Sequence, residues 1–512
     1  MGAAEMSKNI FITGATGFLG SYVAAELLRR GHFLYILSRP KGNEGCNERL
    51  HRALRLWVDN HAAKRLRIFE GDIESRDLGL APEDLAQLRD ISLEILHCAA
   101  CTSFGGSSAD TTFRTNVEGS KNILDFASRV KATTLHFVST AYVAGDFAGP
   151  FSETDLQVGQ GFNNLYEKTK YEAEVIVRDF SRKSQIPVNF FRPSIIMGET
   201  DTGKTTNFNT FYSYFNALGS LKRKLEERLN QEEGGLDGSG IVRKDGFLIL
   251  PLRIAASPRA LKNIVPVDFV GQAIAAVVEG ESNGIKTFHL TNPDPPTMSW
   301  LNSEFNDALG IRGIKLVEEA EITSKQNFFE GIIHRSIKAY RPYLQGEPRF
   351  ICDATHAHLH SLGVYFPKLP GDYYRRLIEY AEKADYGADQ EEPMEKSTAL
   401  IFIESLEKKV GESIIPNLKS LNACFSIRLA DIDKKISLSI KNGILEKLSA
   451  RNGSDSRFTF VLSSDTLGEL IEKKVKPQEA FFEKKIEIEG DMGEALVLAP
   501  IFDEFFRSLG SL

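Results

Sequence analysis

The chain has 512 residues, of which 42% are hydrophobic and 26% charged, and its formal net charge is −7. This length exceeds what one hydrophobic core holds, so we expect a globular protein of two or three domains. An acidic balance without clustered basic residues excludes nucleic-acid binding as a class of function.

Targeting and redox features point to the cytoplasm. No apolar run approaches the ~18–20 residues that span a bilayer, and residues 1–8 lack the basic and apolar regions of a secretory signal. The five cysteines are scattered, which favours reduced thiols. Cys98 and Cys101 form a Cys-x-x-Cys pair, but no second pair accompanies it. We therefore expect buried thiols there rather than a redox or zinc site.

The first predicted unit is a strand, a glycine turn and a helix. The apolar Ile10–Ile12 is followed by Gly14, Gly17 and Gly20, and then by apolar residues at helical spacing in Ser21–Arg30. One glycine allows a sharp turn, one leaves room for a pyrophosphate, and one lets the helix pack against the strand. The helix N-terminus would offer free N–H groups to the phosphates. This order predicts a dinucleotide site.

A second strand is predicted at Phe33–Leu37, and its end indicates which cofactor to expect. In an NAD site, an acidic side chain about 20 residues after the glycines holds the ribose 2′-hydroxyl. Ser38 stands there instead, followed by Arg39, Lys41 and Arg49. Because a guanidinium group binds a phosphate through paired hydrogen bonds, the sequence favours NADPH over NADH.

Three more strands are predicted at Leu66–Phe69, Ile91–His97 and Leu135–Val138, with a helix at Asn116–Ser128. The small residues Cys98-Ala99-Ala100 would let the cofactor lie against the end of the fourth strand. Strands that alternate with helices at this spacing predict an α/β protein with a doubly wound parallel Rossmann sheet. The ligand is then expected at the carboxyl ends of the strands.

Tyr166 and Lys170 lie four residues apart in a predicted helix, residues 166–175, and so share one face. A phenol with a pKa of ~10 is a poor acid at neutral pH, and a lysine ammonium one turn away would lower that pKa. A tyrosine and a lysine at this spacing are common on helices, and in most cases both side chains are simply exposed to solvent. The upstream glycine turn, and a strand that ends at Ser139 and Thr140, favour a catalytic pair here.

These motifs resemble those of extended short-chain dehydrogenase/reductases, and among them the fatty acyl-CoA reductase and thioester reductase family. The resemblance spans roughly residues 8–385. It rests on Thr13–Gly20, Arg49-Leu50, Gly71–Ile73, Leu78–Leu80, His97–Ala100, Asn116–Gly119, Val138–Val143, Tyr166-x-x-x-Lys170, Arg192–Gly198, Leu250-Pro251 and Val265–Val270. The glycine and Tyr-Lys motifs mark only the superfamily. The Arg-Leu, Leu-Gly-Leu and Ser-Thr-Ala-Tyr-Val segments point to the acyl-reducing branch.

The resemblance implies that Thr140 holds the substrate oxygen, Tyr166 donates a proton, and Lys170 binds the nicotinamide ribose. It implies a larger NADPH-binding set: Thr13, Gly14, Thr16, Gly17, Phe18, Leu19, Gly20, Arg39, Arg49, Asp72, Ile73, Ala99, Ala100, Asn116, Lys170, Pro193 and Ile195. Asp72 and Ile73 would border the adenine. The implied chemistry is hydride transfer from NADPH to a long-chain acyl thioester on CoA or acyl carrier protein, giving an aldehyde and/or an alcohol.

Residues 199–262 and 290–385 are expected to form most of a substrate lobe. Leu221, Leu225 and Leu229 repeat at helical spacing within it. The polar, glycine-rich residues 232–246 fit a lid over the acyl site and a mobile surface loop equally well.

A histidine repeat, His356-x-His358-x-His360, would align three imidazoles only on a strand. We expect a surface coincidence there and no metal site.

We expect residues 1–385 to form the reductase domain, residues 386–397 a linker and residues 398–512 a separate α+β domain. The linker contains the acidic, proline-containing stretch Gly387–Ser397. In the last domain we predict helices over 398–421, 466–475 and 494–509, a turn at Asn442-Gly443, and strands at Phe425–Leu429, Ile436–Ile440, Phe458–Leu462 and Ile486–Ile488.

This C-terminal segment resembles a sterol carrier protein-type lipid-binding domain in Leu462–Leu467, Lys476–Phe482 and Lys485–Asp491. The resemblance implies a hydrophobic tunnel for an acyl chain or a sterol. Periodicity does not separate such a tunnel from a solid core filled by the phenylalanines.

Two other functions stay open. One is an NADP-dependent alcohol/ketone oxidoreductase that acts on a sterol-like lipid, because the same Thr-Tyr-Lys chemistry serves a ketone. The other is a non-catalytic lipid-transfer protein, although Thr140, Tyr166 and Lys170 are all present. Peripheral contact with a membrane is compatible with each of these functions.

Overall fold

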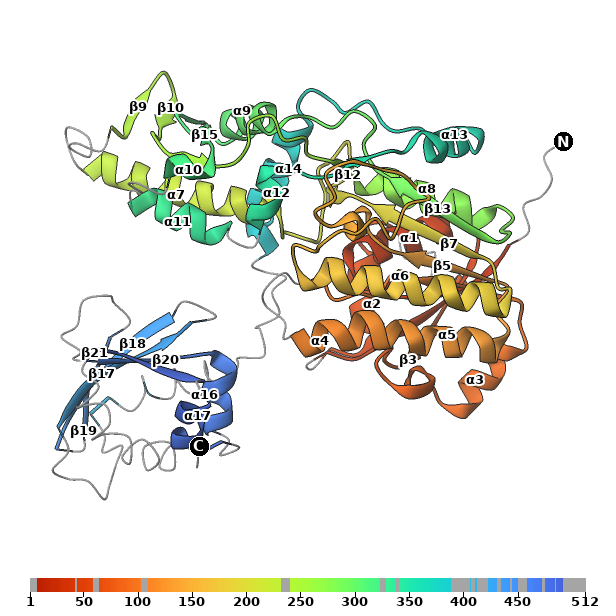
Figure 1. Ribbon diagram of the computed structural model, residues 1–512, viewed down its shortest axis with the longest axis horizontal. Helices are drawn as coiled ribbons and strands as arrows, with labels where there is room; N and C mark the ends of the chain where they lie inside the picture. The colour runs from red at the N-terminus through yellow and green to blue at the C-terminus, as the bar shows by residue number, and fades with distance from the viewer. Residues whose placement is uncertain are drawn as a thin grey trace. The chain divides into compact units, whose positions relative to one another are not determined.

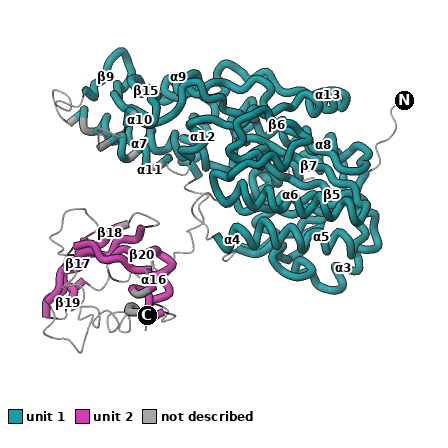
Figure 2. The backbone as a smooth tube through the Cα atoms, in the orientation of Figure 1, with its two compact units in different colours: residues 1–389 teal, residues 390–512 magenta. Residues whose placement is uncertain are grey.

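The computed structural model describes residues 7–387 apart from 42–43, 59–63, 103–108, 232–239, 323–327 and 338–339, and then 406, 410–411, 422–430, 434–442, 444–449, 458–471, 475–483 and 485–490. The chain divides into two compact units, Met1–Asp389 and Gln390–Leu512 (Figure 2). Most of the predicted linker lies outside the described residues and stays a prediction.

The first unit is built on a seven-stranded parallel sheet. Its strands are β1 (Asn9–Thr13), β2 (Phe33–Ser38), β3 (Leu66–Glu70), β4 (Leu93–His97), β5 (Thr134–Val138), β7 (Val188–Pro193) and β13 (Ile285–Leu290). Their order is β3-β2-β1-β4-β5-β7-β13, so the winding direction reverses between β1 and β4. This confirms the predicted doubly wound sheet, to which β7 and β13 add two strands. A ligand site is expected where the winding reverses.

Helices cover both faces of this sheet (Figure 1). One face packs against α1 (Phe18–Arg29) and α8 (Val267–Glu279), and the other against α5 (Gly119–Val130) and α6 (Leu165–Ser184). Alternate residues of β1 enter the two cores, since Ile10 and Ile12 face one layer and Phe11 the other. The predicted helix at 116–128 begins inside a π-helical turn, η3 (Arg114–Glu118), and continues as α5.

Shorter elements connect this scaffold. They are α2 (Cys46–Leu54), η2 (Arg76–Gly79), α3 (Pro82–Arg89), α4 (Ala109–Phe113), η4 (Ala141–Ala144), β6 (Pro150–Phe151), β8 (Ile195–Met197), β12 (Ile264–Pro266), β16 (Arg349–Phe350), α13 (Asp353–Ser361) and η6 (Asp385–Gly387). Two of the pairs are parallel: β8 with β12, and β6 with β16.

A lobe packs around its own apolar core within the first unit. It contains α7 (Phe211–Gln231), β9 (Val242–Lys244), β10 (Phe247–Ile249), β11 (Arg253–Ala255), α9 (Met298–Ala308), β14 (Ile311–Arg312), β15 (Lys315–Val317), α10 (Glu319–Ile322), α11 (Phe328–Ser336), α12 (Arg341–Gln345) and α14 (Tyr373–Lys383). The predicted amphipathic helix is α7, whose Leu221 and Leu225 are buried in this core. The stretch considered as a lid includes β9, and the rest of it lies largely outside the described residues.

The histidine repeat lies on a helix, α13, and not on a strand. His356 is hydrogen-bonded to the Thr291 carbonyl at 3.1 Å, His358 lies against Phe288, and His360 stacks on Tyr365. The His356 and His360 rings lie 6.1 Å apart, whereas His358 contacts Phe288, and the described residues contain no group of three ligands that could hold a metal.

The second unit contains a five-stranded sheet of order β19-β18-β17-β20-β21. Its elements are β17 (Ala423–Leu429), β18 (Lys434–Lys441), β19 (Ile444–Ser449), β20 (Phe458–Leu462), α16 (Ser464–Ile471), α17 (Pro477–Phe482) and β21 (Ile486–Gly490). The predicted antiparallel pair is β17 with β18, whereas β17 and β20 are parallel. The predicted helices at 398–421 and 494–509 lie outside the described residues, except for Leu406, Val410 and Gly411.

Phenylalanines fill part of this second core. The Phe425 ring lies 6.0 Å from Phe458 and 6.1 Å from Phe460, and the latter two are 5.2 Å apart. These rings pack on one another, as the solid-core alternative expects. In the part of the chain that the structure describes, no helix combines the length and apolarity that a bilayer crossing needs.

Candidate active site

A cavity of about 340 Å³ begins at the glycine turn and continues into the lobe. Eleven of the residues proposed from the sequence line it: Gly14, Gly17, Phe18, Leu19, Gly20, Ala100, Thr140, Tyr166, Lys170, Pro193 and Ile195. Apolar side chains of the lobe, among them Phe211, Phe305 and Leu316, line its far part. The structure thus brings the glycine turn, the Tyr-Lys pair and the lobe to one space.

The glycine turn has the geometry of a dinucleotide cradle. Gly14 has a φ of +76°, and a Cβ added to it would lie 2.5 Å from the Ala99 nitrogen. A Cβ on Gly20 would overlap the Gly14 carbonyl, so the helix and the strand could not pack as they do. The first turn of α1 carries no acidic residue. Its N–H groups therefore suit a pyrophosphate, and the residues present fit a dinucleotide.

Two arginines lie beside this turn, at the end of β2. Arg49 donates to Thr16 Oγ1 at 3.4 Å and also to the Arg39 carbonyl. Arg39 pairs with Asp72 at 2.9 Å, and its side chain is 60% exposed. Ser38 ends the strand, and its buried hydroxyl has no hydrogen-bond partner among the described residues. The edge where a 2′-phosphate would lie therefore carries two guanidinium groups.

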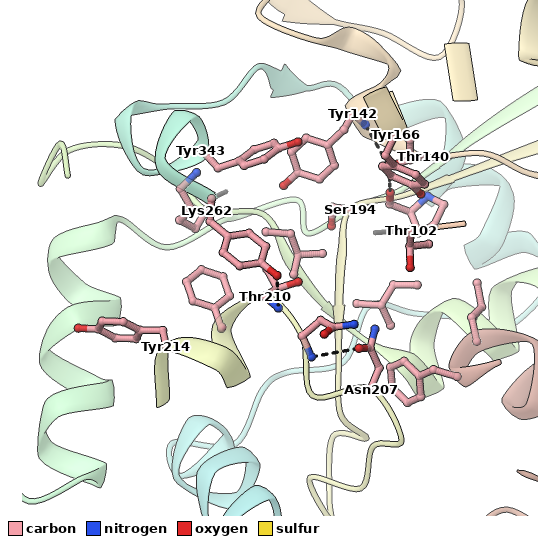
Figure 3. A pocket seen from close by; sticks show the side chains of 18 of the residues that line it. Thr102, Thr140, Tyr142, Tyr166, Ser194, Asn207, Thr210, Tyr214, Lys262 and Tyr343 are labelled. Atoms are coloured by element: carbon pink, nitrogen blue, oxygen red, sulfur yellow. Dashed lines mark hydrogen bonds between the residues drawn. The ribbon is translucent and has the colours of Figure 1, made fainter. Parts of the chain in front are cut away.

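Thr140 and Tyr166 form the polar head of the cavity (Figure 3). Thr140 follows β5, and its hydroxyl donates to the Pro193 carbonyl at 3.4 Å. Tyr166 stands in the first turn of α6, whose N-cap Asn164 accepts from the Glu167 nitrogen at 2.9 Å. Burial raises the pKa of Tyr166 to about 12, and a hydrogen bond with Thr140 offsets part of that rise. The phenol keeps its proton at neutral pH.

The expectation that Lys170 lowers this phenol pKa is wrong for the structure as it stands. Desolvation of the phenolate is the largest influence on this pKa, and it raises the pKa. The Lys170 ammonium instead donates to the Val138 carbonyl at 2.6 Å and lies 4.7 Å from the centre of the Phe137 ring. Burial lowers the pKa of Lys170 to about 8, although the nearby Cys98 and Glu174 oppose this change.

A buried ion network holds the strands on either side of the site. Glu174, one turn beyond Lys170, accepts from Arg192 at 2.6 Å and from the Ser139 hydroxyl at 2.8 Å. Ser139 directly precedes Thr140, and Arg192 directly precedes Pro193. The network therefore fixes α6 against the ends of β5 and β7. Sequence reasoning missed it, because no local pattern pairs these residues.

Eight proposed cofactor residues do not line the cavity: Thr13, Thr16, Arg39, Arg49, Asp72, Ile73, Ala99 and Asn116. Several have structural contacts. Thr13 shares a 2.7 Å hydrogen bond with His97, and Asn116 joins the Cys101 backbone to Thr169. Their roles toward a cofactor stay predictions.

The sequence analysis also missed a polar cluster on the lobe side of the cavity. The cavity lining includes Lys262, Tyr142 and Tyr343, and Glu347 accepts hydrogen bonds from Lys262 and Tyr142.

One cysteine, Cys98, also lines the cavity. It is a free thiol, and burial raises its pKa to about 12. A thiol in that state is a poor redox or metal-binding group.

Comparisons with known proteins agree with this geometry. The profile of the male sterility protein family, an NAD-binding domain, matches residues 12–274, and that of the SCP-2 sterol transfer family matches residues 403–503. Nonribosomal peptide synthetase asaC of Aspergillus flavus is 26% identical over 335 residues, which is 62% of this chain and 30% of that protein. Fatty acyl-CoA reductase 2 of Homo sapiens is 25% identical over 340 residues, covering 57% of this chain and 59% of its own length.

The fold also matches solved structures. The terminal R domain from the myxalamid PKS-NRPS biosynthetic pathway aligns with a TM-score of 0.58 and 22% identity over 75% of this chain and 93% of that one. The curated relatives named above share less than two thirds of their own length with this chain.

Proposed function

Since the chain belongs to the male sterility protein family of NAD-binding domains, and carries an SCP-2 domain at its C-terminus, we propose that it is an NADPH-dependent reductase of long-chain acyl thioesters. The substrate is an acyl group on CoA or on acyl carrier protein, and the product is an aldehyde and/or an alcohol. A fatty acyl-CoA reductase and a nonribosomal peptide synthetase among its relatives support this reaction class.

One observation carries the proposal. Thr140, Tyr166 and Lys170 meet at the head of a cavity that joins the glycine turn to the apolar lobe. A dinucleotide with its pyrophosphate at the turn and an acyl chain in the lobe would bring nicotinamide and thioester together at these three side chains. The site therefore suits transfer of a hydride to a carbonyl that carries a long apolar group.

The residues have distinct tasks in this reaction. A dinucleotide held at the glycine turn by its pyrophosphate would supply, from its nicotinamide, the hydride that the carbonyl carbon accepts. Thr140 and Tyr166 then donate hydrogen bonds to the carbonyl oxygen as negative charge develops on it. Tyr166 can pass its proton to that oxygen, because its pKa of about 12 keeps it protonated. Collapse of the hemithioacetal breaks the carbon–sulfur bond, and the thiol leaves.

Lys170 supplies a positive charge beside the reacting groups. With a pKa of about 8, it is mostly protonated at neutral pH, and its buried position strengthens its field. We assign it to the nicotinamide ribose, as the Tyr-x-x-x-Lys spacing implies.

The choice of NADPH rests on Ser38, which takes the position of the carboxylate in an NAD site, and on the neighbouring Arg39 and Arg49. The assignment of a long-chain acyl substrate rests on the apolar side chains of the lobe that line the cavity. The SCP-2 unit would hold or deliver the lipid.

Thiol release tests this function directly. The protein, incubated with NADPH and palmitoyl-CoA, is expected to release free thiol in step with NADPH oxidation. Reduction of a sterol-like ketone consumes NADPH without releasing a thiol, so NADPH loss with ketones alone would favour the oxidoreductase alternative. Lipid binding without any NADPH consumption would favour a transfer protein.

A further inference from the structure

Lys262 is a buried lysine on the substrate side of the cavity, just before β12. Its side chain is 1% exposed, and it borders the cavity beside Tyr343 and Tyr142 (Figure 3). Among the described residues that line this cavity, two are lysines, Lys170 and Lys262. Of these two, Lys170 is assigned to the cofactor, and Lys262 lies on the side of the substrate.

The carboxylate of Glu347 accepts hydrogen bonds from three donors. It accepts from Tyr142 at 2.8 Å, from Lys262 at 3.2 Å and from the Asn263 backbone nitrogen. The side chain of Glu347 is 2% exposed. Three donors inside the protein therefore hold this carboxylate in place.

The ammonium of Lys262, in contrast, has spare donors. It carries three N–H groups, and Glu347 is its sole hydrogen-bond acceptor among the described residues. Leaving charged donors buried without acceptors is costly. A ligand in the cavity that offered an acceptor atom would remove this cost, whereas a wholly apolar chain at that point would not.

The position of Lys262 relative to the reacting carbonyl is fixed through Tyr142. The Tyr142 hydroxyl shares the Glu347 carboxylate with Lys262, and the Tyr142 backbone nitrogen donates to Thr140 Oγ1 at 3.2 Å. Lys262 and the oxygen-binding threonine are thus linked through two residues, Glu347 and Tyr142, and both line the same cavity. A substrate bound at Thr140 therefore occupies a cavity that Lys262 also lines.

We propose that Lys262 determines substrate specificity by donating a hydrogen bond to a second, uncharged oxygen of the acyl thioester. The proposal rests on the proposed function and narrows its substrate class. The oxygen is uncharged because Glu347 already neutralises the ammonium, and an anion at the same place would face that carboxylate. A carbonyl or hydroxyl oxygen meets these requirements, and a phosphate or a carboxylate does not.

Such an oxygen can come from either side of the thioester. A hydroxyl at the third carbon supplies it from the acyl chain, and an amide carbonyl of the CoA arm supplies it from the thiol. The test uses three substrates: palmitoyl-CoA, 3-hydroxypalmitoyl-CoA and the palmitoyl thioester of ethanethiol, which has neither group. The variant is Lys262→Met, which keeps the length of the side chain and removes its donors.

We expect Lys262→Met to lower kcat/KM at least about tenfold for the substrates that supply the oxygen, and to leave the others unchanged. Loss confined to the 3-hydroxyacyl substrate assigns the oxygen to the acyl chain. Equal loss with both CoA thioesters, but not with the ethanethiol ester, assigns it to the thiol arm. Equal loss with all three, or no loss, overturns the proposal.

Two control variants distinguish loss of the Lys262 hydrogen bond from other effects of the substitution. The double variant Lys262→Met/Glu347→Gln leaves no unpaired carboxylate and should show the same selectivity. Lys315 is an exposed lysine beside the cavity-lining Leu316, and Lys315→Met should leave kcat/KM unchanged for all three substrates. Calorimetric binding of the three thioesters without cofactor gives the same ratios independently of turnover. An inactive wild type whose binding ratios still depend on Lys262 would count against the proposed function and for this inference.

Discussion

The Tyr166 side chain is half-buried and hydrogen-bonded to Thr140, so its hydroxyl is already placed for proton donation. Replacing it in Tyr166→Phe removes only that hydroxyl, and we expect kcat for thioester reduction to fall by about 10²–10⁴-fold. Steady-state kinetics with NADPH measure this. The control is Tyr171→Phe on the same helix, whose ring packs 5.1 Å from Phe162, and which should stay within about twofold of the wild type. An equal fall in both variants would remove Tyr166 from the mechanism.

The pH dependence should follow Lys170 and not Tyr166. The Lys170 pKa is lowered to about 8, so the positive charge is present below that pH and lost above it. Tyr166 stays protonated up to about pH 12. We therefore expect kcat/KM to fall as pH rises through about 8. Lys170→Arg, whose guanidinium stays charged, should move this fall to higher pH, and an unmoved profile would assign it to another group.

Cofactor choice is tested at Arg39 and Arg49. A charged hydrogen bond is worth about 1.5–3 kcal/mol, so the double variant Arg39→Ala/Arg49→Ala should raise the KM for NADPH by about tenfold or more and leave that for NADH unchanged. Arg52→Ala is the control, because Arg52 lies on the same helix and pairs with Glu44. Equal effects on the two cofactors would defeat the NADPH assignment.

At the level of elements, helix α6 links the catalytic residues to the sheet. Tyr166, Lys170 and Glu174 follow one another at intervals of one helical turn. Glu174 binds Arg192 and Ser139, so it sets where Tyr166 and Lys170 stand relative to Thr140. The catalytic geometry therefore depends on an ion pair that contacts no substrate.

Breaking this pair should be costly. Glu174→Gln leaves the Arg192 charge buried without its partner, and we expect a loss of about 3–5 kcal/mol in the free energy of unfolding at pH 7. Denaturant titration measures it, with Asp179→Asn as control, since Asp179 and Lys183 form an exposed pair on the same helix. A loss no larger than that of the control would mean that the pair contributes little.

The same pair gives an acid dependence. Arg192 holds the Glu174 pKa at about 2, below its usual 4.5, although burial opposes this. A depressed carboxyl pKa stabilises the fold above about pH 4.5, and this stabilisation is lost as pH falls toward 2. The stability difference between the wild type and Glu174→Gln should therefore narrow over that range, and a constant difference would contradict the assignment.

The sequence predicts elements well where their signals are local. The five predicted strands of the Rossmann sheet, the glycine turn and the helix bearing Tyr166 all follow from apolar runs or fixed spacing. By contrast, β7 buries Asn189 and Arg192 among its apolar residues, and their partners come from other elements. The Lys262–Glu347 pair is separated by 85 positions, so no local pattern could reveal it.

At the scale of the whole molecule, each unit has its own buried core. The cores of the first unit use residues from Ile10 to Ala381, and that of the second uses Leu406 to Ile486. We therefore expect residues 1–390 alone to fold and to reduce short, soluble acyl thioesters within about twofold of the full chain. Thiol release from acetyl-CoA and hexanoyl-CoA measures this. Complete loss of activity in the shortened protein would make the C-terminal unit part of the active site.

The central claim is that a thioester carbonyl receives hydride at the Thr140–Tyr166–Lys170 site. Mass spectrometry after incubation of the full chain with palmitoyl-CoA and NADPH deuterated at the transferred position tests it most directly. We expect deuterium on the first carbon of the aldehyde or alcohol, one free CoA for each acyl group reduced, and neither product with Tyr166→Phe. NADPH oxidation without deuterium on that carbon, or labelled product formed at an undiminished rate by Tyr166→Phe, would contradict the claim.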